Sequence, residues 1–460
     1  MLFSRRGFVC GSVTTAFSSG AFLRMLAKPA AAASLNTIVV VYEFSGGNDG
    51  FNMVIPLDST NGPLYNRLRA NIAVPLTNIE TAQTMFDATP SAVGMGSTYA
   101  FNPVMTELRA LYAQGRVAVV SGLGLEPSVP NRDGHQQGQF YWATASVNDD
   151  ATSDLGWVGQ TFDALGGSGN ISPMVSVMGS VPIAMHGAKT SPLVVGGDLQ
   201  NFQVNTGNAG GTNGNIALTG TDGYATTSMS SEFARSLAGQ TTNYVSTVQA
   251  YAKAVNPDSV GGGPLSSDYP VTPAYPPYNL SITYPGKAAQ TSGVKVQLAQ
   301  VARLILGGAP ARSYYVRQGG YDTHSSEVAQ QPLLLQEFSE AVSEFYAYLK
   351  GLSASSNVIL MTTSEFGRLP YSNASAGTDH GTASFHFVIG DNANGGLYGT
   401  EVYPNLTPGL TGNYVGVDID FRYYLSAVMQ YLGVDPEIVM GTSAFTNLSG
   451  AGANLGNLIA

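Results

Sequence analysis

The stretch LNTIVVVYEFSGGNDG, residues 35–50, sets the architecture that the rest of the chain follows. Its first ten residues form an apolar run rich in β-branched side chains, which is typical of a strand buried on both faces. The run ends in the polar turn SGGNDG, residues 45–50. A buried strand that leads straight into a polar loop indicates a parallel sheet, in which ligands bind beyond the carboxyl ends of the strands.

The same pattern recurs along the chain. Apolar runs predict further strands at residues 116–121, 313–318 and 357–362. Apolar residues at helical spacing predict helices at residues 103–114, 233–255, 292–306, 333–350 and 421–432. This alternation predicts an α/β protein: a three-layer sandwich with a mostly parallel central sheet covered by helices on both faces.

The N-terminus has the layout of a twin-arginine export signal. The sequence SRRGFV carries the pair Arg5 and Arg6, a mildly apolar stretch follows, and Lys28 precedes the small-residue run PAAAA. We therefore expect residues 1–33 to be a cleaved signal that engages the twin-arginine translocase, and the mature protein to be periplasmic or extracellular. A retained membrane anchor is the alternative, but a short stretch broken by Gly, Ser and Thr would span a bilayer poorly.

Composition narrows the function further. Cys10, the only cysteine, lies in the expected signal, so the mature chain must be held together by its core without disulfides. A formal net charge of -10 argues against nucleic acid as a partner, because nucleic acid requires basic patches. No later stretch is long and apolar enough to cross a membrane, so we expect no stable membrane span after cleavage.

Residues 187–287 differ in composition from their flanks. They are rich in Gly, Asn, Thr, Ser and Pro, and contain GNAGGTNGN and YPVTPAYPPY. We expect a large irregular insertion, part cap and part mobile loop, within one domain that spans residues 34–460. A flexible linker between two domains is the alternative, which the recurring aromatic residues disfavour.

Acidic residues and histidines gather where the predicted strands end. In order these are Asp49 after the first strand, His135 after the second, Asp322 and His324 after the third, Glu365 and Arg368 after the fourth, and Asp379 and His380 shortly beyond. In an open parallel sheet the carboxyl ends of the strands share one edge. One topology would therefore bring all these side chains to a single rim.

Carboxylates and imidazoles together bind divalent metals such as zinc or manganese. Asp322 and His324 offer two ligands in one loop, whereas the adjacent Asp379 and His380 suit one ligand and one supporting partner. Two close ions would clamp a phosphoryl or sulfuryl group, and Arg368 is suited to pair with its oxyanion. The rim thus predicts a site for one or two divalent ions.

Each motif also has a purely structural interpretation. Asp322 is a credible cap for the following helix, and Glu365 and Arg368 are spaced for a local ion pair. His135 can hydrogen-bond the loop around it. His386 alternates with two phenylalanines, a strand pattern that slightly favours a side chain facing solvent. The functional interpretation depends on the repeated order of strand, turn, and acid or histidine.

Taken together, the motifs resemble one family. The twin-arginine start, VVVYEFSGGNDGFNMVIP, GGYDTH, TTSEFGR, GTDHGTASFHFVIG and GVDIDFRYYLSAVMQYLG are similar to the domain-of-unknown-function family 1501. That family is regarded as a divergent relative of the alkaline phosphatase and sulfatase superfamily. The resemblance implies an alkaline-phosphatase-like α/β sandwich with a metal-binding rim, and it supplies no demonstrated reaction.

The resemblance also implies roles for individual residues. Asp49 is similar in place to an acidic ligand of one metal, while Asp322, His324 and His380 resemble the ligands of the other. Glu365 stands where the superfamily has an aspartate. Phe366 stands where it has a histidine and has no lone pair to donate, which puts the second ion in doubt.

The position of the nucleophile also departs from the superfamily. Gly134 stands where the related family often has serine, and no cysteine is available there. A water activated by the metal, or His135 acting as base or ligand, would have to take over. Two functions follow: an exported metal-dependent hydrolase of small-molecule or polymeric phosphate or sulfate esters, or a non-catalytic periplasmic binding or assembly protein that retains the fold.

Overall fold

The structure is a computed structural model that describes residues 36–75, 99–126, 128–147, 155–166, 171–195, 251, 277–399, 417–441, 444 and 455–460. The expected signal at 1–33, most of the expected insertion at 187–287 and nearly all of the expected helix at 233–255 lie outside these residues. Within the described ranges, no helix combines the length and the apolar character that crossing a bilayer would need.

The described residues form a nine-stranded central sheet in the order β12-β4-β11-β10-β1-β9-β5-β6, with β13 beside β4. Its strands are β1 (Ile38–Ser45), β4 (Val117–Gly124), β5 (Met174–Ser176), β6 (Leu193–Val194), β9 (Ser313–Gly319), β10 (Val358–Ser364), β11 (Ala383–Gly390), β12 (Gly396–Tyr398) and β13 (Ile419–Asp420). Only β11 pairs antiparallel with its neighbours in this sheet. The predicted mostly parallel sheet is confirmed.

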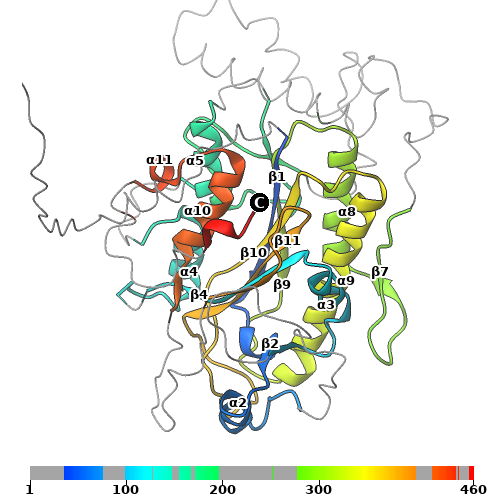
Figure 1. The fold of residues 1–460 in the computed structure, drawn as a ribbon, viewed down its shortest axis with the longest axis vertical. Coiled ribbons are helices and arrows are strands. Elements are labelled where there is room, and N and C mark those ends of the chain that lie inside the picture. Colours follow the sequence, from blue (N-terminus) through cyan, green and yellow to red (C-terminus); the bar gives the residue numbers. More distant parts are fainter. Residues whose placement is uncertain are drawn as a thin grey trace, which may run out of the picture.

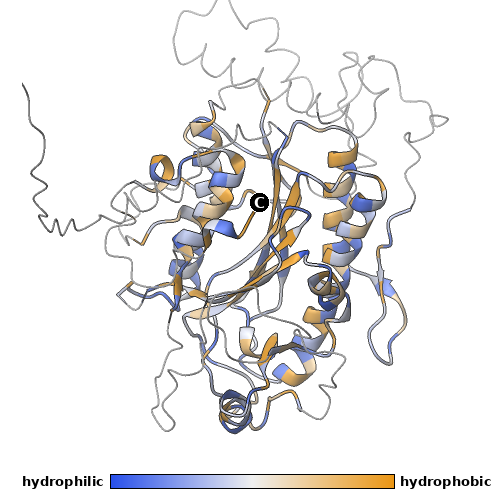
Figure 2. Ribbon diagram, viewed as in Figure 1, coloured by the Kyte–Doolittle hydropathy of each residue, from blue (hydrophilic) through white to orange (hydrophobic). Residues whose placement is uncertain are grey.

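Helices cover both faces of the sheet, which completes the predicted three-layer sandwich (Figure 1). One face carries α3 (Thr106–Ala113), α8 (Gly293–Leu306) and α9 (Glu327–Gly351); the other carries α4 (His135–Thr144), α5 (Trp157–Ala164), α10 (Phe421–Leu432) and α11 (Pro436–Met440). Figure 2 shows hydrophobic residues concentrated in the strands between these layers. Shorter elements are η1 (Gly50–Asn52), η4 (Ile183–Met185), α2 (Asn61–Leu68), and the strand pairs β2 (Val54–Pro56) with β3 (Tyr99–Phe101) and β7 (Ser281–Ile282) with β8 (Gln290–Thr291).

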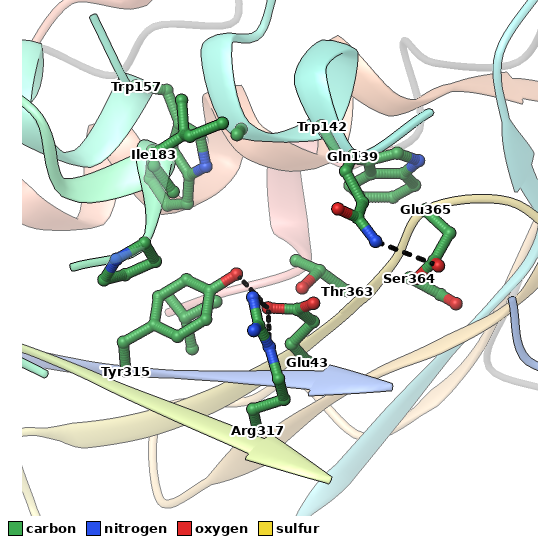
Figure 3. Close-up of a pocket in the computed structure, with 14 residues that line it drawn as sticks. Glu43, Gln139, Trp142, Trp157, Ile183, Tyr315, Arg317, Thr363, Ser364 and Glu365 are labelled. Carbon is green, nitrogen blue, oxygen red and sulfur yellow. Dashed lines mark hydrogen bonds and ion pairs between the residues drawn. The ribbon is translucent and has the colours of Figure 1, made fainter. Parts of the chain in front are cut away.

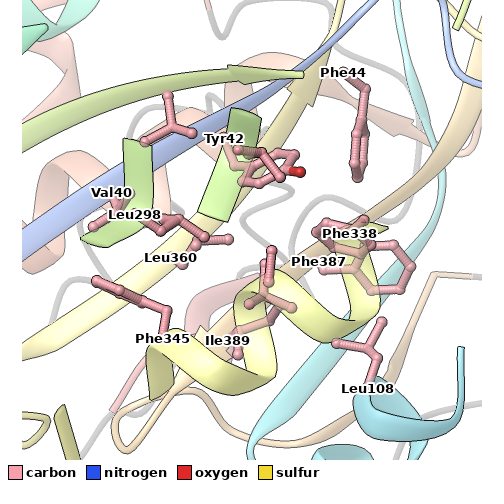
Figure 4. Packing of buried hydrophobic residues seen from close by; sticks show 14 of the residues in the cluster. Val40, Tyr42, Phe44, Leu108, Leu298, Phe338, Phe345, Leu360, Phe387 and Ile389 are labelled. Atoms are coloured by element: carbon pink, nitrogen blue, oxygen red, sulfur yellow. The ribbon is translucent and has the colours of Figure 1, made fainter. Parts of the chain in front are cut away.

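Strand β1 explains why the sheet is buried on both sides. Val40, Tyr42 and Phe44 point into the core under α8 and α9, where Phe338 packs edge-on against both rings (Figure 4). Alternate residues such as Val41 point into the second core under α4 and α10. Since successive side chains of a strand face opposite sides, the continuous apolar run fills two cores at once.

The register of the three central strands builds the rim. In β1, Phe44 pairs with Gln318 of β9 on one side and with Ser364 of β10 on the other. These parallel strands therefore end level with one another, and the loops that follow them leave the sheet side by side.

Candidate metal centre

Four side chains meet above the ends of these strands. Asp322 and His324 come from the loop after β9, His380 from the loop after β10, and His135 is the first residue of α4. The Nε2 atoms of His324 and His380 are 2.9 Å apart, and Asp322 Oδ1 lies 3.2 Å from the first and 3.4 Å from the second. His135 Nε2 lies 3.4 Å from Asp322 Oδ2, so three imidazoles surround one carboxylate.

Each of the three imidazoles is held from behind through its other nitrogen. Nδ1 of His135 lies 3.0 Å from Glu365 Oε1, and Nδ1 of His380 lies 2.7 Å from the carbonyl oxygen of Asp133. Nδ1 of His324 lies 3.3 Å from Asp379 Oδ1. All three partners are acceptors, so a neutral imidazole that donates through Nδ1 has its lone pair on Nε2, the atom that faces Asp322.

This donor set fits a divalent ion. The lone pairs of His324 and His380 face each other at 2.9 Å, an arrangement that is repulsive unless a cation lies between them or one ring is protonated. Ligand atoms bound tetrahedrally to zinc at its usual bond lengths lie about 3.3 Å apart. Asp322 Oδ1, His324 Nε2 and His380 Nε2 are 2.9–3.4 Å from one another, and His135 Nε2 lies 3.4 Å from the other oxygen, Asp322 Oδ2. Three imidazoles and a carboxylate are ligands that zinc and manganese both accept.

Local electrostatics keep the ligands in their metal-binding protonation states. Burial, and then repulsion by the Arg368 guanidinium, lower the pKa of His380, so its imidazole stays neutral near neutral pH. Burial opposes ionisation of Asp322, but the hydrogen bond and positive charge of Arg368 outweigh it and lower the pKa of that carboxyl.

The centre is accessible from one side. The side chains of His135, Asp322 and His324 are 40%, 43% and 44% exposed, whereas that of His380 is 21% exposed. An ion held there would face solvent on that side.

Arg368 lies behind the centre and not on its open side. Its side chain is fully buried, and its donors reach the carbonyl oxygens of Gly46, Gly47, Tyr321 and Thr378 and, at 2.6 Å, Asp322 Oδ1. With these acceptors around it, Arg368 joins three loops and orients Asp322. These contacts all lie within the protein, and the pairing of Arg368 with a substrate oxyanion stays a prediction.

The other predicted ligands are placed differently from one another. Glu365 and Asp379 each contact the Nδ1 atom of an imidazole of the centre: Glu365 contacts His135, and Asp379 contacts His324. Asp49 is fully buried, pairs with Arg69, and makes none of the contacts that join the described side chains of the centre. The structure thus brings Asp322, His324 and His380 together as expected, and adds His135 to them.

Phe366 packs against two imidazoles of the centre. Its ring stacks on His380 with centroids 4.1 Å apart and lies 5.0 Å from the ring of His135. Gly47 accommodates it: with φ at +79°, any side chain there would be strained and would overlap the Phe366 ring. The Phe366 ring therefore forms an apolar wall beside these two imidazoles.

Two features of the site were not anticipated from the sequence. The Asp133 carbonyl holds His380, although a backbone acceptor leaves no signal in residue type. His386 was expected to favour solvent, but it is buried and packs on Trp142 at 5.0 Å, and burial lowers its pKa to about 3. The alternation was interpreted correctly as a strand, but that strand, β11, is covered on both faces.

One comparison with known proteins, with family models, supports the family resemblance over part of the chain. No curated protein matches the chain. Among solved structures, it is similar to the lipoteichoic acid synthase LtaP from Listeria monocytogenes, at 8% identity and a TM-score of 0.33 over 95% of this chain and 82% of that one. It is also similar to an alkaline phosphatase from the Antarctic bacterium TAB5, at 11% identity and a TM-score of 0.33 over 79% of this chain and 95% of that one. Residues 288–441 match the family model described as "Protein of unknown function (DUF1501)", which confirms the resemblance over the segment that carries Asp322, His324 and His380.

Proposed function

We propose that this protein is an exported metal-binding protein that hydrolyses phosphate or sulfate esters. One observation carries the proposal: three imidazoles, each held by an acceptor at Nδ1, turn Nε2 toward the Asp322 carboxylate. Imidazoles supported at Nδ1 are the form in which histidine binds a divalent ion through Nε2.

The ion would be held by Asp322, His324, His380 and His135, with zinc or manganese as the best match to these ligands. When bound, such an ion supplies Lewis-acid activation of water and of a phosphoryl or sulfuryl oxygen.

The start of α4 supports an anionic substrate. His135 is the first residue of this ten-residue helix, and its N-cap Gly134 provides no side-chain cap for the first-turn N–H groups. Helix N-termini with available N–H groups attract anions. A tetrahedral anionic group at the centre would therefore face both the imidazole of His135 and the positive end of α4.

Gly134 also favours a second candidate function. Gly134, the N-cap residue of α4, has no hydroxyl or thiol, so a covalent intermediate has no side chain to form on at that position. A protein that binds a metal and an anion without turnover, in a binding or assembly role, satisfies the same geometry.

Metal analysis separates these candidates. Purified mature protein should take up about one zinc or manganese ion per chain, and Asp322→Ala and His380→Ala should lose it. His186→Ala, which removes a half-buried histidine outside the centre, is the matched control and should retain the ion. Failure of the wild type to bind either metal would rule out both candidates. Binding without hydrolysis of any phosphate or sulfate ester would favour the second.

Export is tested separately. Replacing Arg5 and Arg6 with lysines should hold the precursor in the cytoplasm, because the translocase recognises the arginine pair. Cell fractionation followed by N-terminal sequencing of the exported form measures both export and the expected cleavage near residue 33.

A further inference from the structure

A cavity lies next to the metal centre, on the face of the sheet that α4 covers (Figure 3). It is a small cavity of about 70 Å³ that is partly open to solvent, and it lies between α4, the start of α5, η4 and the ends of β1, β9 and β10. Trp142 and Trp157, the only two tryptophans of the chain, both line it.

Helix α4 connects the cavity to the metal centre. His135, Gln139 and Ala143 are spaced four residues apart and lie along one side of this helix, the first at the centre and the other two at the cavity. Glu365 belongs to both: it lines the cavity, and its Oε1 accepts from His135 at 3.0 Å and from Gln139 at 3.3 Å. The cavity and the centre therefore share the Glu365 side chain and the same side of α4.

The walls of the cavity are mainly aromatic and aliphatic. Trp142, Trp157 and Tyr315 present rings, and Ile183 at the rim keeps 40% of its surface exposed. A large aliphatic side chain left exposed beside aromatic walls suits an apolar ligand group that would cover it.

The charged groups of the floor already satisfy each other. Glu43 Oε2 accepts from the Tyr315 hydroxyl at 2.7 Å and from Arg317 Nε at 2.9 Å. The guanidinium of Arg317 is therefore balanced by a carboxylate within the same cavity. A flat, uncharged ring matches this lining better than an anionic or cationic group does.

We propose that this cavity holds the aryl group of an ester whose phosphoryl or sulfuryl group lies at the metal centre. The proposal rests on the proposed hydrolase function, and it specifies aryl esters as the preferred substrate class. Products would be the corresponding phenol and inorganic phosphate or sulfate, with water supplying the oxygen that replaces the phenol.

The two tryptophans provide a readout that needs neither metal nor turnover. Titration of metal-free protein with phenol, followed by tryptophan emission, should give a saturable change. Ala143→Leu fills the cavity from α4 and should weaken phenol binding by about tenfold or more, the scale that one misfitting aliphatic group imposes in an apolar pocket. Ala110→Leu, the same change at an exposed position of α3, is the control and should bind as the wild type does. Ile183→Ala at the exposed rim should also weaken binding, and it keeps the test available if Ala143→Leu does not fold.

Absence of a saturable emission change, or equal binding by the wild type and both cavity variants, would overturn the proposal. Activity distinguishes it from the proposed function. If the metal-loaded wild type hydrolyses phenyl phosphate and methyl phosphate with equal kcat/KM, the proposed role of the cavity is wrong, while the proposed hydrolase function is supported. If phenol binds and the cavity variants lower its affinity while no ester is hydrolysed, the cavity is an aryl-binding site and the proposed hydrolase function is wrong.

Discussion

Two polar clusters lie near the same end of the sheet, and they differ in solvent exposure and in how their charges are paired. The metal centre groups His135, Asp322, His324 and His380 around a point open to solvent. The buried carboxylate cluster, which we define as Asp49, Arg69 and Glu327, has side chains that are all 0% exposed. Both contain acidic residues beyond strand ends, so residue type alone does not distinguish a metal-binding site from a structural ion pair.

The difference lies in where the polar atoms point. In the buried carboxylate cluster, Arg69 pairs with Asp49, and Glu327 accepts hydrogen bonds from Asn52 and Thr378. The carboxylates of this cluster therefore have their partners within the protein. In the metal centre, lone pairs converge and the balancing positive charge of Arg368 comes from behind. The buried carboxylate cluster stabilises the loops that carry the ligands, whereas the metal centre has lone pairs that an added cation can bind.

The largest expected effect comes from opening the buried carboxylate cluster. Arg69→Ala leaves the buried Asp49 carboxylate without its cation, and we expect it to lower the free energy of unfolding by about 3–5 kcal/mol. Arg116→Ala is the control, since its side chain is 35% exposed beside Asp391 and its removal should cost less than about 1 kcal/mol. Urea unfolding measures both. Equal losses for the two variants would mean that burial does not distinguish these ion pairs.

Glu365→Gln tests the metal centre from its buried side. His135, Gln139 and the backbone N–H of Gly46 all donate to Glu365, so an amide NH₂ group must face at least one donor. We expect metal affinity to fall about 10–100-fold, as for other partners of ligating histidines. Competitive titration of zinc against a chelator measures the affinity. Unchanged affinity would show that His135 does not take part in binding.

The pH dependence of stability reports on Glu327. Burial, and then the nearby charge of Asp49, raise the pKa of Glu327 well above its ordinary value. The folded protein therefore holds a proton that the unfolded chain releases above about pH 4.3, so the stability it contributes is lost as pH rises toward the folded pKa, by at most about 1.4 kcal/mol per pH unit. Glu327→Gln carries a permanent donor and should flatten this decline in unfolding free energies measured across neutral pH. A decline as steep as that of the wild type would contradict it.

The sequence was sufficient for the parts of the fold that depend on apolar periodicity. The helix predicted at 421–432 has the bounds of α10, and the runs at 313–318 and 357–362 became β9 and β10 with changes of one or two residues at their ends. The rim followed from the same pattern, because parallel strands that end level must place their loops together.

Side-chain direction could not be predicted in the same way. Asp49 does follow β1, but it turns inward because Arg69, twenty residues later, pairs with it. His135 enters the centre because Gly138 lets α4 approach the Glu365 carbonyl so closely that a Cβ would overlap it. No local pattern marks either contact, and α4 itself was missed because glycine and glutamines interrupt its apolar spacing.

Asp379→Asn should have the smallest effect and completes the comparison of exposed with buried support. Asp379 Oδ1 accepts from His324 Nδ1 at 3.3 Å, as Glu365 does from His135, but its side chain is 55% exposed. An asparagine oxygen can keep this hydrogen bond while its NH₂ group turns to water, and solvent already screens the lost charge. We expect zinc affinity to fall less than about tenfold, below the loss from Glu365→Gln, in the same chelator titration. If the two variants lose equally, the charge behind each imidazole matters more than its burial, and the open side of the centre supports the ion as strongly as the buried side.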